Sequence, residues 1–439
     1  MVRILCDIQF SARVLSIVFV LLGCIRPTLA NRNVRPNILL ILADDVGREV
    51  LECYGGSSYQ TPNLNDLAKK GAKLNHCYAM PVCHPTRVTL MTGLYPRHLG
   101  NPKWGTFPAR AEKRTFANLV KNAGYATAVA GKWQLSLLKD DRYQPRRLGF
   151  DQWSLFGWHE GPRYHEPLIY ENGLVRSDTA GKYGPDIYLD FLIEFMRKNQ
   201  RSRTPFLAFY SMALCHDVTN DLTEPVPHGP SGRYDNFGEM VVQMDNQIGR
   251  IMDFLESSGL DSETLILFTT DNGTPLRSKI SAIDHQNQFI YEEINSEYEG
   301  VLVPGGKGKL TDWGTRVPMI AVWKGIIQPE QTWDDLVDLS DILPTLTELA
   351  GAEIPVEWSI DGHSFYDLLS GEGSSSRRWV YSEYRGKYFA KTRERKLYHN
   401  GKYFNTERDP FEQTSLDRSS LSAQAKEDLQ ILQQAMTDL

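Results

Sequence analysis

Two fully apolar runs constrain the fold of this chain of 439 residues more than any other feature. Residues 37–43 read NILLILA, and residues 264–270 read TLILFTT. A short apolar run without a polar face is typical of a strand that is buried on both sides. Both runs are therefore predicted to be inner strands of a sheet that is covered by helices.

Helical patterns alternate with strand patterns along most of the chain. Apolar residues at helical spacing, together with capping residues, predict helices over 62–70, 85–92, 115–122, 186–198, 240–255 and 341–350. Further strands are predicted over 126–131, 206–211 and 319–323. Such alternation predicts an α/β fold with a large, mainly parallel or mixed sheet sandwiched by helices.

The pattern changes towards the end of the chain. A Gly/Ser-rich break at 371–376 is followed by short aromatic strands at 379–384, 387–390 and 396–399 and by a polar helix. These elements predict a smaller C-terminal α+β subdomain. The predicted organisation is a targeting segment over 1–30, a catalytic domain over 31–350 and the subdomain over 351–439.

The first 30 residues are predicted to be a targeting segment. Arg3 and Arg13 supply positive charge, an apolar run follows at 14–22, and residues 28–30 (TLA) resemble a cleavage site. The run is far shorter than the ~20 residues that span a bilayer, so no transmembrane span is expected in the mature chain. Residues 21–24 (LLGC) also resemble a lipobox. We expect an exported protein, periplasmic or secreted, with a lipid anchor at Cys24 as an open alternative.

Charge and cysteine content narrow the classes of partner. The net charge of −6 offers no general attraction to nucleic acid, so an anionic substrate must be met by local basic residues. Four of the six cysteines lie beyond the targeting segment, at positions 53, 77, 83 and 215. They are too sparse for a disulfide scaffold or a zinc site. A Cys53–Cys77 disulfide stays open.

Acidic pairs follow both apolar runs. Asp44 and Asp45 come directly after the first run, and Asp271 and Asn272 come directly after the second. Ligands of open α/β sheets gather beyond the carboxyl ends of the strands. Carboxylate and amide oxygens there suit a hard cation such as Ca²⁺ or Mg²⁺. The competing interpretation is that each pair caps a turn before a glycine.

A cysteine is predicted at the start of a helix in the segment CHPTR, residues 83–87. Free N–H groups and the helix dipole favour anions at such a position, and the guanidinium of Arg87, one turn later, can reach the same point. A planar five-donor group beside a helix N-terminus suits a tetrahedral oxyanion. The plainer alternative is an inert structural Cys83.

The segment resembles C-x-P-x-R, the signature of the type I, formylglycine-dependent sulfatases of the alkaline phosphatase superfamily. The resemblance extends in family order from residue 36 to about residue 415. Its matching segments are LMTG (90–93), GKW (131–133), CH (215–216), TDNG (270–273), GGKG (305–308) and RVP (316–318). It implies an alkaline phosphatase-like fold and a hydrolase of sulfate esters, with sulfated carbohydrates as the expected substrates.

The resemblance also implies roles for single residues. Cys83 would be oxidised to formylglycine (3-oxoalanine) by a formylglycine-generating or sulfatase-maturating enzyme, and its hydrate would attack sulfur. Arg87 would hold that hydrate, and Lys132, His216 and Lys307 would bind the sulfate and the leaving oxygen. Ca²⁺, with Mg²⁺ as the less expected metal, would be bound by Asp44, Asp45, Asp271, Asn272 and the modified Cys83.

Two positions depart from the family pattern. Gln134 stands where the family has a histidine, and an amide cannot act as a base at neutral pH. Residues 312–314 (DWG) replace a Glu-Gly-Gly segment, which predicts a changed pocket shape. Because the signature does not separate sulfate from phosphate esters, a phosphonate or phosphate ester hydrolase of the same superfamily stays open. Gln134 leaves a second alternative open, a catalytically impaired protein that binds sulfated glycans.

An aromatic segment supplies the candidate substrate contacts. Residues 153–170 place Trp158 and His165 in a loop that glycine and proline interrupt. Aromatic rings suit the faces of sugars, and histidine or arginine suits additional anionic groups. A loop that merely packs on the core is the competing interpretation.

Overall fold

The computed structural model describes residues 35–217, 230, 234–283 and 289–439. The predicted targeting segment, including the lipobox and Cys24, lies outside the described residues. Within the described ranges, no helix combines the length and the apolar character that crossing a membrane requires.

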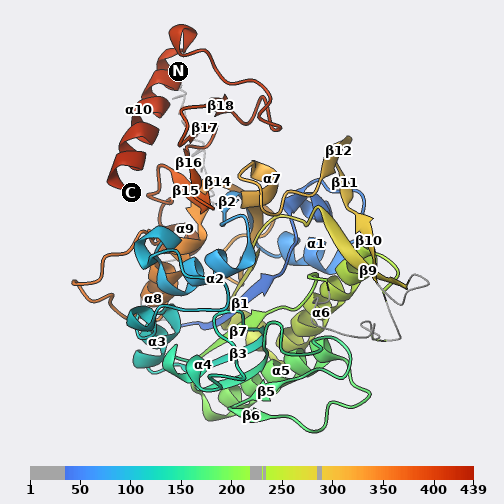
Figure 1. The fold of residues 1–439 in the computed structure, drawn as a ribbon. Helices are drawn as coiled ribbons and strands as arrows, with labels where there is room; N and C mark the ends of the chain where they lie inside the picture. Colours follow the sequence, from blue (N-terminus) through green and yellow to red (C-terminus); the bar gives the residue numbers. More distant parts are fainter. Residues whose placement is uncertain (1–34, 218–229, 231–233, 284–288) are drawn as a thin grey trace, which may run out of the picture. The chain divides into compact units, whose positions relative to one another are not determined.

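A mixed sheet of ten strands forms the centre of the fold (Figure 1), in the order β14-β2-β13-β8-β1-β7-β3-β4-β5-β6. Strands β1, β7, β8, β3 and β4 run parallel, whereas β13 runs antiparallel to both β8 and β2. The predicted large sheet is thereby confirmed in its mixed form. In sequence order its strands are β1 (Asn37–Ala43), β2 (Ala72–Tyr78), β3 (Ala126–Lys132), β4 (Gln152–Phe156), β5 (Tyr170–Glu171), β6 (Leu174–Val175), β7 (Phe206–Ser211), β8 (Thr264–Thr270), β13 (Arg316–Trp323) and β14 (Gln331–Asp338).

Helices cover both faces of this sheet, as the apolar runs predict. In β1, Leu39 and Ile41 pack in one hydrophobic cluster, with α1, α5 and α6, whereas Leu40 and Leu42 pack in another, with α2, α3 and α8. All four side chains are fully buried. The helices are α1 (Pro62–Lys69), α2 (Cys83–Thr92), α3 (Phe116–Asn122), α5 (Gly184–Ser202), α6 (Phe237–Ser258) and α8 (Ile342–Leu349).

The ends of two helices differ in detail from the sequence prediction. Helix α2 begins at Cys83 rather than at Pro85, so the cysteine is itself the first helical residue. Thr61 precedes α1 as predicted, but its hydroxyl makes no capping bond to the helix and instead accepts the N–H of Glu52. Cys53 and Cys77 are both free thiols, so the disulfide left open by the sequence does not form.

The C-terminal residues form the smaller subdomain. A four-stranded antiparallel sheet consists of β15 (Val380–Tyr384), β16 (Lys387–Lys391), β17 (Arg395–Tyr398) and β18 (Tyr403–Asn405), and α10 (Ala423–Asp438) packs against it. Lys396 links this sheet to α7 (Asp312–Thr315), because its Nζ lies 2.7 Å from Oδ1 of Asp312.

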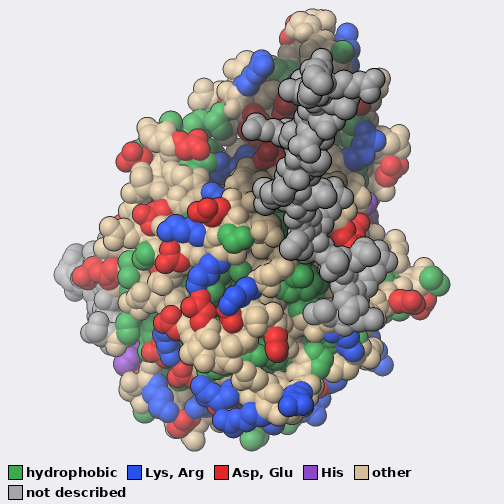
Figure 2. Space-filling model, turned by 180° about the vertical axis from the view of Figure 1, so that it is seen from behind, with side chains coloured by type: hydrophobic (Ala, Val, Ile, Leu, Met, Phe, Trp, Pro, Cys, Tyr) green, Lys and Arg blue, Asp and Glu red, His purple; other side chains and the backbone are tan. Residues whose placement is uncertain are grey.

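The remaining elements are short. They are α4 (Gln144–Arg147), α9 (Tyr366–Ser370) and the hairpin strands β9 (Arg277–Ile283), β10 (Phe289–Glu293), β11 (Asn295–Tyr298) and β12 (Val301–Pro304). On the face seen in Figure 2, basic and acidic side chains are interspersed and form no single continuous basic surface.

Candidate active site

The acidic pairs that follow β1 and β8 lie side by side. The two strands are parallel neighbours, with Ala43 opposite Thr270, so their carboxyl ends meet at one edge of the sheet. The side chains of Asp44, Asp45, Asp271 and Asn272 are all at least 99% buried. The backbone N–H of Asp45 donates to Oδ1 of Asp271 (3.2 Å), and Nδ2 of Asn272 donates to Oδ1 of Asp45 (2.8 Å).

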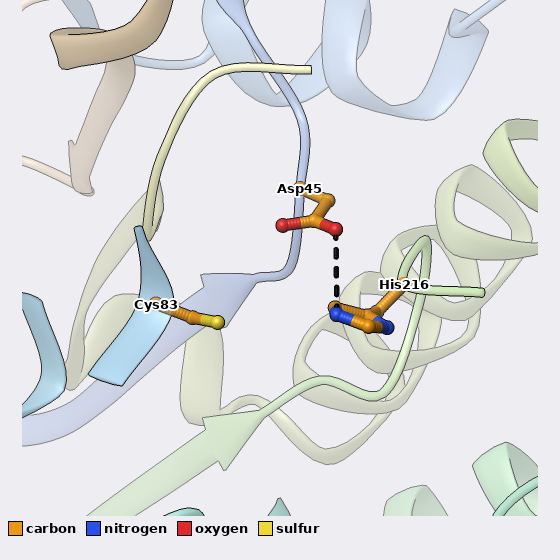
Figure 3. Close-up of side chains that lie close together, drawn as sticks. All are labelled: Asp45, Cys83 and His216. Atoms are coloured by element: carbon orange, nitrogen blue, oxygen red, sulfur yellow. Dashed lines mark ion pairs between the residues drawn. The ribbon is translucent and has the colours of Figure 1, made fainter. Parts of the chain in front are cut away.

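Cys83 opens α2 beside these carboxylates. Its Sγ lies within 4.8 Å of side-chain atoms of Asp44 and Asp271, and within the same distance of side-chain atoms of Asp45 and His216 (Figure 3). Burial raises the pKa of the thiol, while the cations of Lys132 and Lys307 act in the opposite direction. Cys83 therefore stands at the N-terminus of a helix, surrounded by acidic and basic groups.

Arg87 is held by a carboxylate rather than pointing freely towards a ligand. Its Nε and Nη2 donate to Oδ2 of Asp271 (3.1 and 2.8 Å), and Nη1 donates to the hydroxyl of Ser211 (2.5 Å). That hydroxyl in turn donates to the backbone oxygen of Lys132 (2.7 Å). Ser211, the last residue of β7, thus connects Arg87 to β3. No sequence pattern distinguishes this serine from others that end a strand.

The two lysines of the candidate site each pair with an aspartate. Nζ of Lys132 lies 2.5 Å from Oδ2 of Asp44, and Nζ of Lys307 lies 2.6 Å from Oδ2 of Asp45. Burial works to lower the pKa of Lys307, but the neighbouring negative groups, led by Asp45, outweigh it, and the pKa is raised. Together with Arg87, these lysines balance the charge of the three buried carboxylates.

His216 follows β7 and faces the same centre. Its Nε2 lies 3.6 Å from Oδ2 of Asp45 (Figure 3), and its Nδ1 lies 2.9 Å from the backbone oxygen of Asp217. Burial lowers the pKa of the imidazole well below its ordinary value, and Lys307 and Lys132 lower it further. The ring is therefore neutral near pH 7.

Trp158 is in direct contact with the candidate catalytic side chains. Nζ of Lys132 lies 4.5 Å from the centroid of its ring, and the ring of His216 packs edge-on at 4.7 Å. His165, by contrast, lies 3.9 Å from Glu166 and forms a backbone bridge with Tyr183. The predicted pocket segment therefore contributes Trp158 to the centre, whereas the contacts of His165 lie along its own loop.

Arg163 is a buried cation to which the sequence pattern gave no separate role. Its side chain is 2% exposed, and Nη1 lies 3.4 Å from Nδ1 of His216. Its guanidinium lies 4.9 Å from the ring centroid of Trp158, and Nη2 has no hydrogen-bond partner among the described residues. Burial and partners of this kind become visible only in three dimensions.

Gln134 and Asp312, the two departures from the family pattern, occupy different surroundings. Gln134 is fully buried with a φ of 49°, and neither polar atom of its amide has a partner within the described part of the chain. Asp312 pairs instead with Lys396 and accepts the hydroxyl of Tyr78 (3.1 Å). Asp312 therefore contacts the C-terminal sheet.

Two buried oxygens of the acidic cluster stay unpaired in the described structure. They are Oδ1 of Asp44 and Oδ1 of Asn272. An unpaired buried acceptor costs roughly 1–3 kcal/mol, so such oxygens call for a donor or a cation. Both belong to the oxygen-ligand set that suits a hard divalent metal. The residues present therefore fit a metal at this position.

Two family models match this chain, and together they span residues 36–415. The family model "Sulfatase" matches residues 36–352, and the model "N-sulphoglucosamine sulphohydrolase, C-terminal" matches residues 307–415. Steryl-sulfatase of Mus musculus is 30% identical, over 83% of this chain and 69% of that protein. N-acetylgalactosamine-6-sulfatase of Sus scrofa is also 30% identical, over 80% of this chain and 69% of that protein.

A solved structure agrees with the fold. A sulfatase from Pseudoalteromonas sp. superposes with a TM-score of 0.70 at 22% identity, with 92% of this chain and 90% of that chain covered. The family model that spans residues 36–352 contains the whole candidate site, from Asp44 to Lys307. The chain therefore belongs to the sulfatase family and is a sulfuric ester hydrolase.

Proposed function

We propose that this sulfatase removes sulfate from sulfated carbohydrates, using formylglycine made from Cys83 and a bound Ca²⁺. The observation that carries the proposal is the position of Cys83. It opens a helix within 4.8 Å of two pairs of candidate ligand residues, Asp44 with Asp271 and Asp45 with His216. A helix N-terminus favours an anionic group, and the neighbouring oxygens favour a cation.

The metal would be held by Asp44, Asp45, Asp271 and Asn272, with the modified side chain of residue 83. The unpaired oxygens of Asp44 and Asn272 support this set. A divalent cation there would supply positive charge against the sulfate oxygens. Oxygen ligands alone favour Ca²⁺ or Mg²⁺ over zinc, and Ca²⁺ tolerates the larger and less regular ligand set.

The cationic side chains would bind the sulfate group. Lys132, from β3, pairs with Asp44, and Lys307, from the loop after β12, pairs with Asp45. His216, neutral near pH 7, is placed to exchange a proton with the leaving oxygen. Formylglycine, once it had added water, would supply two hydroxyls: one to attack sulfur, and a second whose loss of a proton would expel sulfate and restore the aldehyde. Arg87 keeps Asp271 in position through its two-pronged contact.

The organisation of the whole chain is part of the proposal. Residues 1–30 would direct export to the periplasm or the outside of the cell, with Cys24 as an alternative lipid attachment point. Residues 31–350 would form the catalytic domain and residues 351–439 the subdomain. The second family model spans 307–415, so it joins the Lys307 loop to the C-terminal sheet. A formylglycine-generating or sulfatase-maturating enzyme would be the required partner.

The deciding experiment is a substrate panel. The chain is co-expressed with a formylglycine-generating enzyme and assayed with sulfated sugars, steryl sulfate, an aryl sulfate and the matching aryl phosphate. Turnover of at least one sulfated sugar with a kcat/KM well above that of the steryl ester supports the proposal. Preference for the aryl phosphate would instead support the phosphate ester alternative, and binding of sulfated sugars without any turnover would support the impaired binding protein.

Trp158→Ala is expected to lower kcat/KM on the best sugar substrate by about 10-fold or more. The ring is buried against both Lys132 and His216, so its removal takes a packing contact away from two groups of the site. Steady-state kinetics measure the effect. His165→Ala tests the second predicted contact, and Trp358→Ala, a half-buried tryptophan elsewhere, serves as the matched control. Unchanged kinetics for Trp158→Ala and His165→Ala would mean that this loop only packs on the core.

Gln134→His is expected to raise kcat or to lower the pH at which activity peaks. Release of sulfate needs a base that takes the proton from the second hydroxyl of the formylglycine hydrate. A histidine with a pKa near 6.5 suits that task, whereas an amide does not. A general base contributes about 10²- to 10⁴-fold. The backbone at φ 49° accepts histidine more readily than most residues. Steady-state pH–rate profiles test this, and identical profiles in a folded, formylglycine-modified variant would exclude position 134 from proton transfer.

A further inference from the structure

A cleft of about 620 Å³ lies where the loop after β12 meets the small C-terminal sheet. It begins at Gly308, directly after Lys307, and its far wall is formed by the turns of the β15–β16 and β17–β18 hairpins. Its basic lining residues are Lys309, Arg385, Lys387, His399 and Lys402.

The cleft adjoins the candidate active site through two contacts. Lys307 lies 2.6 Å from Asp45, so the residue before the cleft belongs to the acidic cluster. The N–H of Gly308 donates to the backbone oxygen of Pro81 (2.7 Å), two residues before Cys83. The loop that carries Lys307 into the candidate site therefore also lines the cleft, one residue further along the chain.

The cleft carries an excess of positive charge. Lys309, Arg385, Lys387 and Lys402 are exposed, and none of them forms an ion pair with a carboxylate in the described part of the chain. The single acidic lining residue, Glu412, is already bound by Nζ of Lys396 (2.7 Å) and by the hydroxyl of Tyr398. Four cations without a carboxylate partner among the described residues are thus concentrated in a protein whose net charge is −6, which favours an anionic ligand at this place.

The walls of the cleft are fixed relative to the catalytic loop. The backbone oxygen of Leu310 accepts hydrogen bonds from Nζ of Lys396 (3.1 Å) and from the hydroxyl of Tyr398 (3.0 Å). Lys396 also pairs with Asp312 on the same loop. Tyr398, Phe404 and Phe411 add aromatic side chains to the lining, and such rings pack well on sugar faces.

We propose that this cleft binds the further anionic groups of a sulfated oligosaccharide whose terminal sulfate ester lies at Cys83. The inference rests on the proposed function and specifies its substrate as a chain with several charges. A steryl sulfate has one anionic group and an apolar body, so it would leave the cations of the cleft unpaired. Mouse steryl-sulfatase and pig N-acetylgalactosamine-6-sulfatase are both 30% identical to this chain, so identity does not separate steryl from sugar substrates. The cleft favours a carbohydrate substrate.

The test compares two triple variants. Arg385→Gln, Lys387→Gln and Lys402→Gln together remove three charges of the cleft. Lys113→Gln, Arg201→Gln and Lys426→Gln remove three exposed cations elsewhere that form no ion pair among the described residues. Each enzyme is assayed with a sulfated tetrasaccharide and with an aryl sulfate that is too short to reach the cleft. The cleft variant is expected to lower the tetrasaccharide-to-aryl-sulfate ratio of kcat/KM by at least 10-fold, through KM, while the control changes it by less than 2-fold.

A binding measurement separates this inference from the catalytic proposal. In a Cys83→Ala background, calorimetry with a sulfated hexasaccharide is expected to show a Kd at least 10-fold weaker for the cleft variant, with a smaller dependence on salt. The inference is overturned if the cleft variant loses kcat/KM equally on the tetrasaccharide and the aryl sulfate. It is also overturned if the cleft variant and the control variant bind the hexasaccharide with the same Kd. A parent enzyme that hydrolyses steryl sulfate but no sulfated sugar overturns the proposed substrate class, whereas the Kd comparison still decides the cleft.

Discussion

Cys83→Ala is expected to lower kcat/KM for sulfate ester hydrolysis by about 10³-fold or more. Removing a nucleophile from a preorganised site typically costs this much, because the remaining groups can only bind and polarise the ester. The cations around residue 83 remain in place in the variant, so KM should change much less than kcat. Steady-state kinetics with an aryl sulfate measure both parameters.

Peptide mass spectrometry tests the chemical identity of residue 83. In active enzyme, the peptide that contains it is expected to have lost one sulfur and two hydrogens and gained one oxygen, as the change from thiol to aldehyde requires. Cys53→Ala, which removes a free thiol outside the acidic cluster, is the matched control and should keep its activity. An unmodified thiol at position 83 in fully active enzyme would contradict the mechanism.

Exhaustive chelation is expected to lower kcat by about 10²-fold or more, a loss typical of removing one electrostatic contact to the reacting group. Chelation should lower the folding stability only modestly. The repulsion among the three carboxylates that the metal leaves behind is already offset by Arg87, Lys132 and Lys307. A ligand present at 100 times its Kd stabilises the folded state by about 2.7 kcal/mol. Added Ca²⁺ should therefore restore the activity and raise the Tm.

Two aspartate variants locate this metal effect. Asp44→Asn removes one charge of the proposed ligand set and should abolish the rise of the Tm with Ca²⁺. Asp245→Asn is the matched control, because Asp245 is equally buried but accepts the N–H groups of Asn63 and Leu64 at the start of α1. A Tm that responds to Ca²⁺ in the same way in both variants would place the cation elsewhere, and full activity after chelation would exclude a catalytic metal.

The sequence predicted the central strands well because their chemistry is local. The strands over 37–43, 206–211 and 264–270 have the predicted bounds, because a short, continuous apolar run is typical of a strand that is buried on both faces. Strand β2 was missed because Lys73, Asn75 and His76 interrupt its apolar residues. It lies between β13 and β14, and its pairing with these distant strands cannot be inferred from its own residues.

The candidate site shows the same division between local and distant information. The sequence placed Asp44 and Asp271 at the ends of two buried strands, and the structure adds that these strands are parallel neighbours. It gave the reach of Arg87 from the helix but not its partner, because that partner, Asp271, lies 184 residues away in the sequence. The surroundings of Gln134 and Arg163 depend on burial by distant segments. The sequence alone therefore could not predict which groups surround these two side chains.

The burial of Cys83 limits when the proposed oxidation of its thiol can take place. Its side chain is 4% exposed, and the groups around it come from positions as far apart as Asp44 and Lys307. If an enzyme oxidises Cys83 as proposed, it must reach the thiol before the residues that bury it, Lys307 among its neighbours, have folded around it. Lys307 follows Cys83 by 224 residues, which a ribosome that adds about 5–20 residues per second needs roughly 10–45 s to make. For the proposed oxidation, the distance along the sequence between Cys83 and Lys307 would thus provide a period during synthesis in which the thiol is still accessible.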